Sequence, residues 1–225
     1  MNRTTAKVAG KHSQSWKQDP EGVRRDILDV AISEFAARGL SGARIDDIVA
    51  RTRTSKRMIY YYFGDKDGLY ARALEVAYSK VRRGEEELDL DGLPPLKALE
   101  KLVGFTFDHH RANPDFIRMV MIENIHNADF IRKSDMIRGL NVAAIDTLRN
   151  ICSRGAKDGD FRADTDPVRL HWQISALSFF NVSNQPSFSA LFGPDLFTDT
   201  QQKILRDEII RLVVGSVRVS TEPTT

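Results

Sequence analysis

The sequence predicts an all-α fold of about nine helices, in which a three-helix N-terminal bundle is followed by a larger helical domain. Apolar residues recur at the i, i+3, i+4 spacing of one helix face along most of the chain, and few segments alternate with the period of two that a strand requires. Glycine or proline stands at many of the points where one periodic segment ends and the next begins. The 225 residues, 41% hydrophobic and 28% charged, are enough chain for a sizeable core.

The first three predicted helices lie within residues 21–66. The first begins near Glu21, stops at Gly39, and has one apolar face made of Leu28, Ala31, Ile32 and Phe35. The second is RIDDIVAR at 44–51, with its isoleucines facing inward. The third is SKRMIYYYF at 55–63, which follows a break at 52–54 and is N-capped by Thr54 or Ser55.

Six further helices are predicted in the rest of the chain. Their ranges are 65–88, 95–111, 114–130, 133–158, 167–184 and 200–219. Pro95, Pro114 and Pro167 open three of them, and Gly159 ends a fourth. Residues 185–197 are predicted to be a loop, and the final STEPTT a disordered tail.

Several classes of protein are excluded by what the sequence lacks. There is no apolar run near the roughly 20 residues of a membrane span, and no apolar signal segment at the start, so a cytoplasmic protein with no membrane contact is expected. The single cysteine, Cys152, excludes an intramolecular disulfide and a cysteine-cluster zinc site. Glu123 and His126 share a helix face without a third ligand at fixed spacing, so neither a metal site nor another cofactor is predicted. No nucleophile motif, phosphate-binding glycine loop or carboxylate pair is present, which predicts a protein that is not an enzyme.

Charge is distributed unevenly along the chain. Residues 1–66 carry a net charge of +5 and residues 67–225 a net charge of −3. This pattern indicates either a polyanionic partner for the N-terminal part or an ordinary solvated basic surface. Residues 1–20 hold four cations without apolar periodicity, so we expect a flexible basic arm there, with or without a role in binding DNA.

The helix at 55–63 has one cationic and aromatic face. On a helical wheel Lys56, Arg57, Tyr60 and Tyr61 fall within roughly 140°, with Met58, Ile59 and Tyr62 on the other side. Since a short helix follows a short helix across a three-residue break, the pair fits a helix-turn-helix whose second helix enters the DNA major groove. A surface helix whose tyrosines pack on a partner is the alternative.

Side-chain chemistry assigns an expected DNA contact to each residue. Lys56 and Arg57 can donate to guanine or phosphate, and Thr54 and Ser55 to phosphate or base. Tyr60 and Tyr61 can donate to phosphate or touch a thymine methyl group. Arg44 and Lys66, at helix starts, favour phosphate.

The segment ILDVAISEFAARGLSGARIDDIVARTRTSKRMIYYYFGDKDGLYARAL resembles the DNA-binding domain of the TetR family of transcriptional repressors. The resemblance implies a DNA-binding domain at 21–66, with contacts carried over best to Ser55, Tyr60, Tyr62 and Lys66. The sequence departs from the family pattern in its turn, where Arg53 stands in place of a glycine, and at Met58, where a small threonine is common.

The resemblance implies that residues 67–220 form a ligand-binding and dimerisation domain, with a homodimer contact through the last two helices. Excess apolar residues on those two helices agree with a second interface. The stretch from Trp172 to Phe180 resembles regulators of aromatic or pyrimidine catabolism and suggests a small, flat effector such as an aromatic compound. The candidate ligand-binding residues are Phe105, His109, Met119, Glu123, Asn124, His126, Trp172, Ser175, Phe179 and Asn184. Aromatic and polar residues of this kind equally describe a packed core.

The sequence therefore predicts a homodimeric repressor that binds a palindromic double-stranded operator and is released by a small-molecule effector. One alternative is an architectural DNA-binding protein that senses nothing, for which the C-terminal domain needs no cavity. Another is a helical enzyme that carries a DNA-binding-like bundle and keeps its activity when residues 1–66 are deleted.

Overall fold

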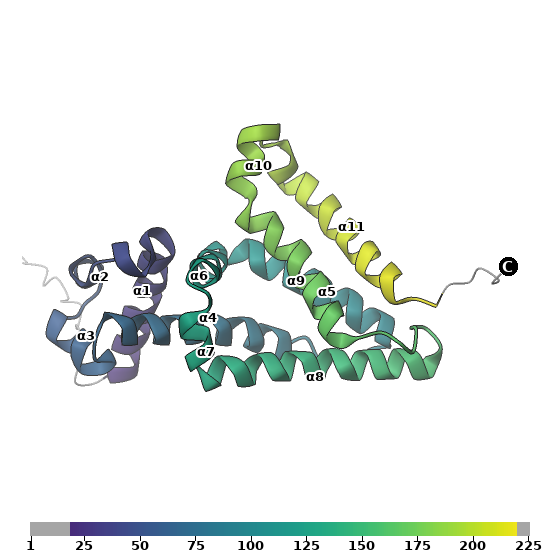
Figure 1. The fold of residues 1–225 in the computed structure, drawn as a ribbon, viewed down its shortest axis with the longest axis horizontal. Coiled ribbons are helices and arrows are strands. Elements are labelled where there is room, and N and C mark those ends of the chain that lie inside the picture. Colours follow the sequence, from purple (N-terminus) through teal and green to yellow (C-terminus); the bar gives the residue numbers. More distant parts are fainter. Residues whose placement is uncertain (1–18, 220–225) are drawn as a thin grey trace, which may run out of the picture.

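A computed structural model describes residues 19–219, so residues 1–18 of the predicted arm at 1–20 and the last six residues lie outside this range. The described chain is all-α, as predicted, and elongated, with the N-terminal bundle at one end (Figure 1). The helices are α1 (Pro20–Gly42), α2 (Ile45–Arg51), α3 (Lys56–Phe63), α4 (Lys66–Glu86), α5 (Pro95–Ala112), α6 (Pro114–Ile125), α7 (Asp129–Lys133), α8 (Asp135–Asp158), α9 (Pro167–Ser183), α10 (Gln185–Phe192), the 3₁₀ helix η1 (Asp195–Phe197) and α11 (Asp199–Val217). Within 19–219, no helix combines the length and the apolar character needed to cross a membrane.

The N-terminal bundle shares its core with helices that follow it. Ile27 and Phe35 of α1, Ile48 of α2 and Ile59 of α3 are all fully buried in one cluster. The same cluster includes Met119 of α6, together with residues of α4 and α8. The N-terminal bundle is thus held by contacts that reach into the C-terminal part of the chain.

A second core fills the opposite end of the molecule. It is formed by buried apolar residues of α5, α8, α9 and α11, and it includes Cys152. The helix α4 runs from the N-terminal bundle toward this second core and contacts α1, α5, α6 and α8 on the way (Figure 1). A displacement of α4 therefore changes contacts at both ends of the molecule.

Gly39 ends the regular part of α1, as the sequence predicts. Its φ of +69° and ψ of 174° interrupt the helix, and only glycine adopts this region without strain. Gly159 ends α8 in the left-handed conformation, with φ +79°.

The prediction of one helix over 114–130 was wrong, because α6 ends at Ile125. Asn127 and Ala128 adopt left-handed φ values of 56° and 59°. The Glu123 side chain then accepts hydrogen bonds from the backbone N–H groups of Phe130 and Ile131, both at 3.2 Å, and so caps the first turn of α7. A cap supplied by a side chain seven and eight residues before the capped N–H groups is outside the usual N-cap pattern, so the sequence did not reveal it.

The predicted loop at 185–197 was also wrong, because α10 and η1 form there. Proline at 186 lies in the first turn of α10, where its missing N–H costs nothing. Phe188 packs against Phe192 and Phe197, with ring centroids 4.8 and 6.0 Å away, so the segment folds back on itself. With α7 and α10 added, the described chain has eleven α-helices where about nine were expected.

Candidate DNA-binding surface and effector pocket

The helices α2 and α3 form a helix-turn-helix whose ends are fixed by local hydrogen bonds. Ser55 is the N-cap of α3, and its hydroxyl accepts from the Met58 N–H at 3.4 Å. Gly64 ends α3 with φ +80°, and Asp65 caps α4 by accepting from the Gly68 N–H at 2.7 Å. Ile59 is the one fully buried side chain of α3, and the exposed face of this helix carries Lys56, Arg57, Tyr60 and Tyr61.

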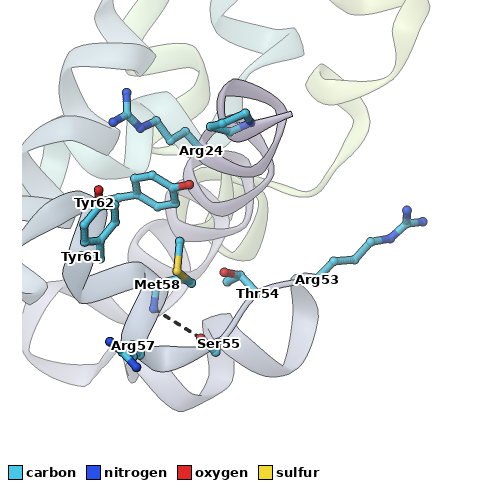
Figure 2. A pocket seen from close by; sticks show the side chains of 9 residues that line it. Arg24, Arg53, Thr54, Ser55, Arg57, Met58, Tyr61 and Tyr62 are labelled. Carbon is cyan, nitrogen blue, oxygen red and sulfur yellow. Dashed lines mark hydrogen bonds between the residues drawn. The ribbon is translucent and has the colours of Figure 1, made fainter. Parts of the chain in front are cut away.

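A groove of about 1010 Å³ runs between the start of α1 and α3 (Figure 2). It is lined by Pro20, Arg24, Arg53, Thr54, Ser55, Arg57, Met58, Tyr61 and Tyr62. The Arg24 guanidinium lies 4.8 Å from the centroid of the Tyr62 ring, a cation–π distance. The lining includes three arginines and no carboxylate, which makes the groove attractive to a polyanion.

A second cavity, of about 300 Å³, lies among helices α4, α5, α6, α8 and α9. Its apolar lining consists of Val81, Phe116, Val120, Trp172, Ala176 and Phe179, and its polar lining of Tyr78, Arg82, Glu85, Thr106, His110, Asn124, Asn141, His171 and Ser175. The volume is at the small end of the range for ligand pockets. This cavity is the candidate site for a small-molecule effector, and in that sense we refer to it as the effector pocket.

Two family models cover both parts of the chain. The model of the bacterial regulatory proteins of the tetR family matches residues 27–73. The model of the tetracyclin repressor-like C-terminal domain matches residues 95–213, more than half of the chain. The chain belongs to the TetR family of transcriptional regulators.

Relatives along most of the chain agree with this family. The HTH-type transcriptional repressor NicS of Pseudomonas putida is 35% identical over 186 residues, which are 83% of this chain and 87% of NicS. The HTH-type transcriptional regulator RutR of Escherichia coli is 22% identical over 222 residues, 97% of this chain and 99% of RutR. Among solved structures, the transcriptional regulator SCO4942 of Streptomyces coelicolor has a TM-score of 0.66 and 26% identity, covering 87% of this chain and 98% of that chain.

Five of the nine residues predicted to contact DNA line the groove of this TetR-family chain: Thr54, Ser55, Arg57, Tyr61 and Tyr62. In Figure 2, Ser55 and Arg57 lie at the start of α3, and the two tyrosines lie toward its end, beside Arg24. Tyr61 is the most exposed of these tyrosines, with 77% of its surface accessible. Sequence reasoning missed Arg24, whose only signal was the pair of arginines at 24 and 25, directly after the first turn of α1.

The other four predicted DNA-contacting residues lie outside the groove. Tyr60 is exposed on α3, and Arg44 is the exposed N-cap of α2. Lys56 pairs with Asp46 at 3.0 Å, and this hydrogen-bonded carboxylate raises the pKa of Lys56. Lys66 donates to the Ala43 carbonyl at 3.3 Å, so this side chain ties α4 to the start of α2.

The turn before α3 closes without the family's glycine. Arg53 has an ordinary negative φ, and its backbone N–H donates to the Asp26 carboxylate at 3.3 Å. In Figure 2 its side chain extends away from the tyrosines. The residue therefore adds an exposed cation to the groove without straining the turn.

Four of the ten predicted ligand-binding residues line the effector pocket: Asn124, Trp172, Ser175 and Phe179. Trp172 is 70% exposed, so it lies at the mouth of the pocket. The four come from α6 and α9, two helices that were predicted to converge on the ligand.

The other six predicted ligand-binding residues lie elsewhere. Glu123 is 1% exposed, and besides capping α7 it accepts from the Tyr70 hydroxyl at 3.0 Å. Met119 is buried in the N-terminal core. Phe105 packs over Gly84, where an added Cβ would come within 2.6 Å of its ring. His109, His126 and Asn184 lie respectively beside a separate 220 Å³ hollow, at the end of α6 and at the junction of α9 and α10.

Sequence reasoning missed the charged part of the effector pocket. Arg82 and Glu85 belong to the run VRRGEEE, which has the composition of a solvated helix face. Both side chains turn inward instead, form an ion pair one helix turn apart, and place Arg82 Nη2 3.2 Å from the Asn141 side-chain oxygen. Only the packing of α4 against α8 decides this orientation.

Burial keeps the histidines of the effector pocket uncharged at neutral pH. Desolvation, with a smaller contribution from His109, lowers the pKa of His110 to about 4. Desolvation also lowers the pKa of His171, and it raises the pKa of Glu85 against the opposing effect of Arg82. Arg82 is therefore the one fixed positive charge on the lining.

Proposed function

We propose that this chain is a homodimeric cytoplasmic repressor that binds a palindromic operator and is released when a small, flat effector enters the effector pocket. Membership of the TetR family indicates a DNA-binding regulator rather than an enzyme. The observation that carries the proposal is that one chain holds an arginine-lined groove on its helix-turn-helix and a separate cavity 300 Å³ in volume. An architectural protein has no need of the cavity.

The exposed part of α3 supports its use as the recognition helix. Arg57 lies in the first turn, from which side chains reach base edges in the major groove. We assign Arg57 to a guanine and Ser55 to a phosphate or base. Tyr60, Tyr61 and Tyr62 are assigned to the sugar-phosphate backbone of the DNA. Arg44, Thr54, Lys56 and Lys66 supply further phosphate or base contacts in this proposal. The domain from 21 to 66 is then the DNA-binding unit, with the preceding arm as an additional cationic contact.

The exposed apolar residues of α9 and α11 support a dimer contact. Val168, Trp172 and Phe180 of α9 are 55–70% exposed, and Leu212 of α11 is 63% exposed. The two helices contact each other and run side by side in Figure 1, so a second copy can cover both at once. A two-fold axis here presents two recognition helices to half-sites about one DNA turn or more apart.

The helix α6 supports a link between the effector pocket and the DNA-binding end. Val120 and Asn124 line the pocket, whereas Met119 lies in the core shared with α1. A ligand that shifts α6 therefore shifts a surface on which α1 rests. The expected coupling is about 1–3 kcal/mol, and operator binding must weaken the effector by the same factor.

A binding-site selection on random duplex DNA tests the proposal. We expect the wild-type protein to recover a palindrome, and Arg57→Ala to lose about 1–3 kcal/mol of discrimination at one base of each half-site. Arg83→Ala is the matched control, because Arg83 is exposed on α4 and does not line the groove. Recovery of the same motif at the same strength by Arg57→Ala would show that Arg57 does not read a base, and recovery of no motif by the wild type would refute the proposed function.

A further inference from the structure

We propose that the effector is a compact, flat carboxylic acid whose carboxylate binds Arg82 in the effector pocket. This inference rests on the proposed function, because it assigns a chemical class to the ligand of that pocket. It follows from three features of the pocket: an unused donor on a buried guanidinium, the balance of charge on the lining, and the aromatic walls.

The one nitrogen of the Arg82 guanidinium that is not engaged within residues 19–219 is Nε. The whole residue is only 9% exposed, and Nη1 and Nη2 are engaged by Glu85 and Asn141. Nε is buried and has no hydrogen-bond partner among residues 19–219. A buried charged donor left without an acceptor is costly, so a ligand that brings an acceptor to the Arg82 guanidinium is favoured, with a small rotation of this side chain to open Nε to the pocket.

The charged groups on the lining, one guanidinium and one carboxylate, can accommodate at most a single negative charge on that acceptor. The ionisable groups on the lining are Tyr78, Arg82, Glu85, His110 and His171. Burial raises the pKa of Tyr78 to about 12 and lowers the pKa of His110 to about 4, so both groups are uncharged at neutral pH. Only Arg82 and Glu85 then carry charge, and burial disfavours the ionised form of Glu85 by raising its pKa. An arriving carboxylate gains a charge-assisted hydrogen bond from Arg82 and neutral imidazoles nearby that can donate to it.

The walls of the pocket define the rest of the ligand. Phe116, Trp172 and Phe179 contribute three aromatic rings from α6 and α9 to one small cavity. Rings stack on a flat apolar body better than on a branched or sugar-like one. The volume of about 300 Å³ limits that body to one or two fused rings with a short acidic group.

Calorimetric titration of the full-length protein with matched pairs of probes tests the inference. The probes are benzoate, phenylacetate and 2-naphthoate, each paired with its primary amide, which has the same shape without the charge. We expect at least one acid to bind about tenfold or more tightly than its amide. That preference should disappear in Arg82→Gln/Glu85→Gln, which replaces the ion pair by two amides and leaves no buried carboxylate unpaired. Arg83→Gln, one residue further along α4 and exposed, should keep it.

Operator binding and the thermal midpoint are measured on the same samples without ligand, to separate the possible failures. If the wild-type protein does not bind the operator in the absence of ligand, the proposed function itself is refuted. If operator binding is intact, the carboxylate inference is overturned when none of the three acids binds, when the amides bind as tightly as the acids, or when the double variant keeps the preference. A folded double variant that binds the operator and no longer prefers the acid supports it.

Discussion

Replacing Tyr70 by phenylalanine is expected to loosen the joint between the DNA-binding end and the rest of the chain. Tyr70 is fully buried on α4, and its ring packs edge-on against Phe35 of α1 and Phe130 of α7, at 5.0 and 4.9 Å between centroids. Its hydroxyl donates to Glu123 of α6 at 3.0 Å. Burial and the nearby Glu123 carboxylate raise the pKa of Tyr70, so the hydroxyl stays a proton donor. Phenylalanine keeps the packing and removes only this bond.

The magnitude follows from the burial of the acceptor. Glu123 is 1% exposed, so water cannot replace the lost donor without rearrangement. A hydrogen bond to a charged group contributes about 1.5–3 kcal/mol, and we take about 2 kcal/mol for Tyr70→Phe. For a chain of this size, that loss lowers the thermal midpoint by about 4–8 °C.

Differential scanning calorimetry at one fixed protein concentration, without ligand, measures the effect, because dimerisation makes the midpoint concentration-dependent. Tyr78→Phe is the matched control on the same helix. Tyr78 is also largely buried, but no hydrogen bond of its hydroxyl occurs among the described residues, so its removal should cost much less. Equal thermal midpoints for Tyr70→Phe and the wild type, or equal decreases of the midpoint in both variants, would refute a stabilising role for the hydrogen bond between Tyr70 and Glu123.

Three further predictions concern the backbone, the effector pocket and its protonation. Gly39→Ala should cost about 1–3 kcal/mol in urea unfolding because φ is +69°, whereas Gly139→Ala, on the open side of α8, should stabilise; similar effects of both would contradict this. Asn124→Leu should preserve operator binding and abolish release by the effector, whereas loss of folding would assign Asn124 to packing. Between pH 6.5 and about 4, His110 binds a proton in the unfolded chain but not in the folded one, so the free energy of unfolding decreases by up to about 3 kcal/mol as the pH is lowered through this range. Unfolding of His110→Gln, measured over the same pH range, should show a correspondingly smaller decrease.

The sequence by itself determined the helical class, most helix ends and the recognition segment. The stop at Gly39, the Ser55 cap and the prolines that open α5, α6 and α9 act within a few residues of the backbone they control. Such local rules can be followed along the chain without knowing the fold. The spacing of the residues from 54 to 62 similarly sufficed to group five side chains that line the groove.

Only the tertiary structure decided the roles of the polar residues away from α3. Glu123 was expected to bind ligand, yet its partner Tyr70 lies 53 residues away in the sequence. Arg82 resembles a solvated arginine, yet it meets Asn141, 59 residues further along, and turns into the effector pocket. A polar side chain on a partly apolar helix needs a hydrogen-bond partner, but helical periodicity says nothing about which distant element supplies it. That choice is made when α4, α6 and α8 pack together.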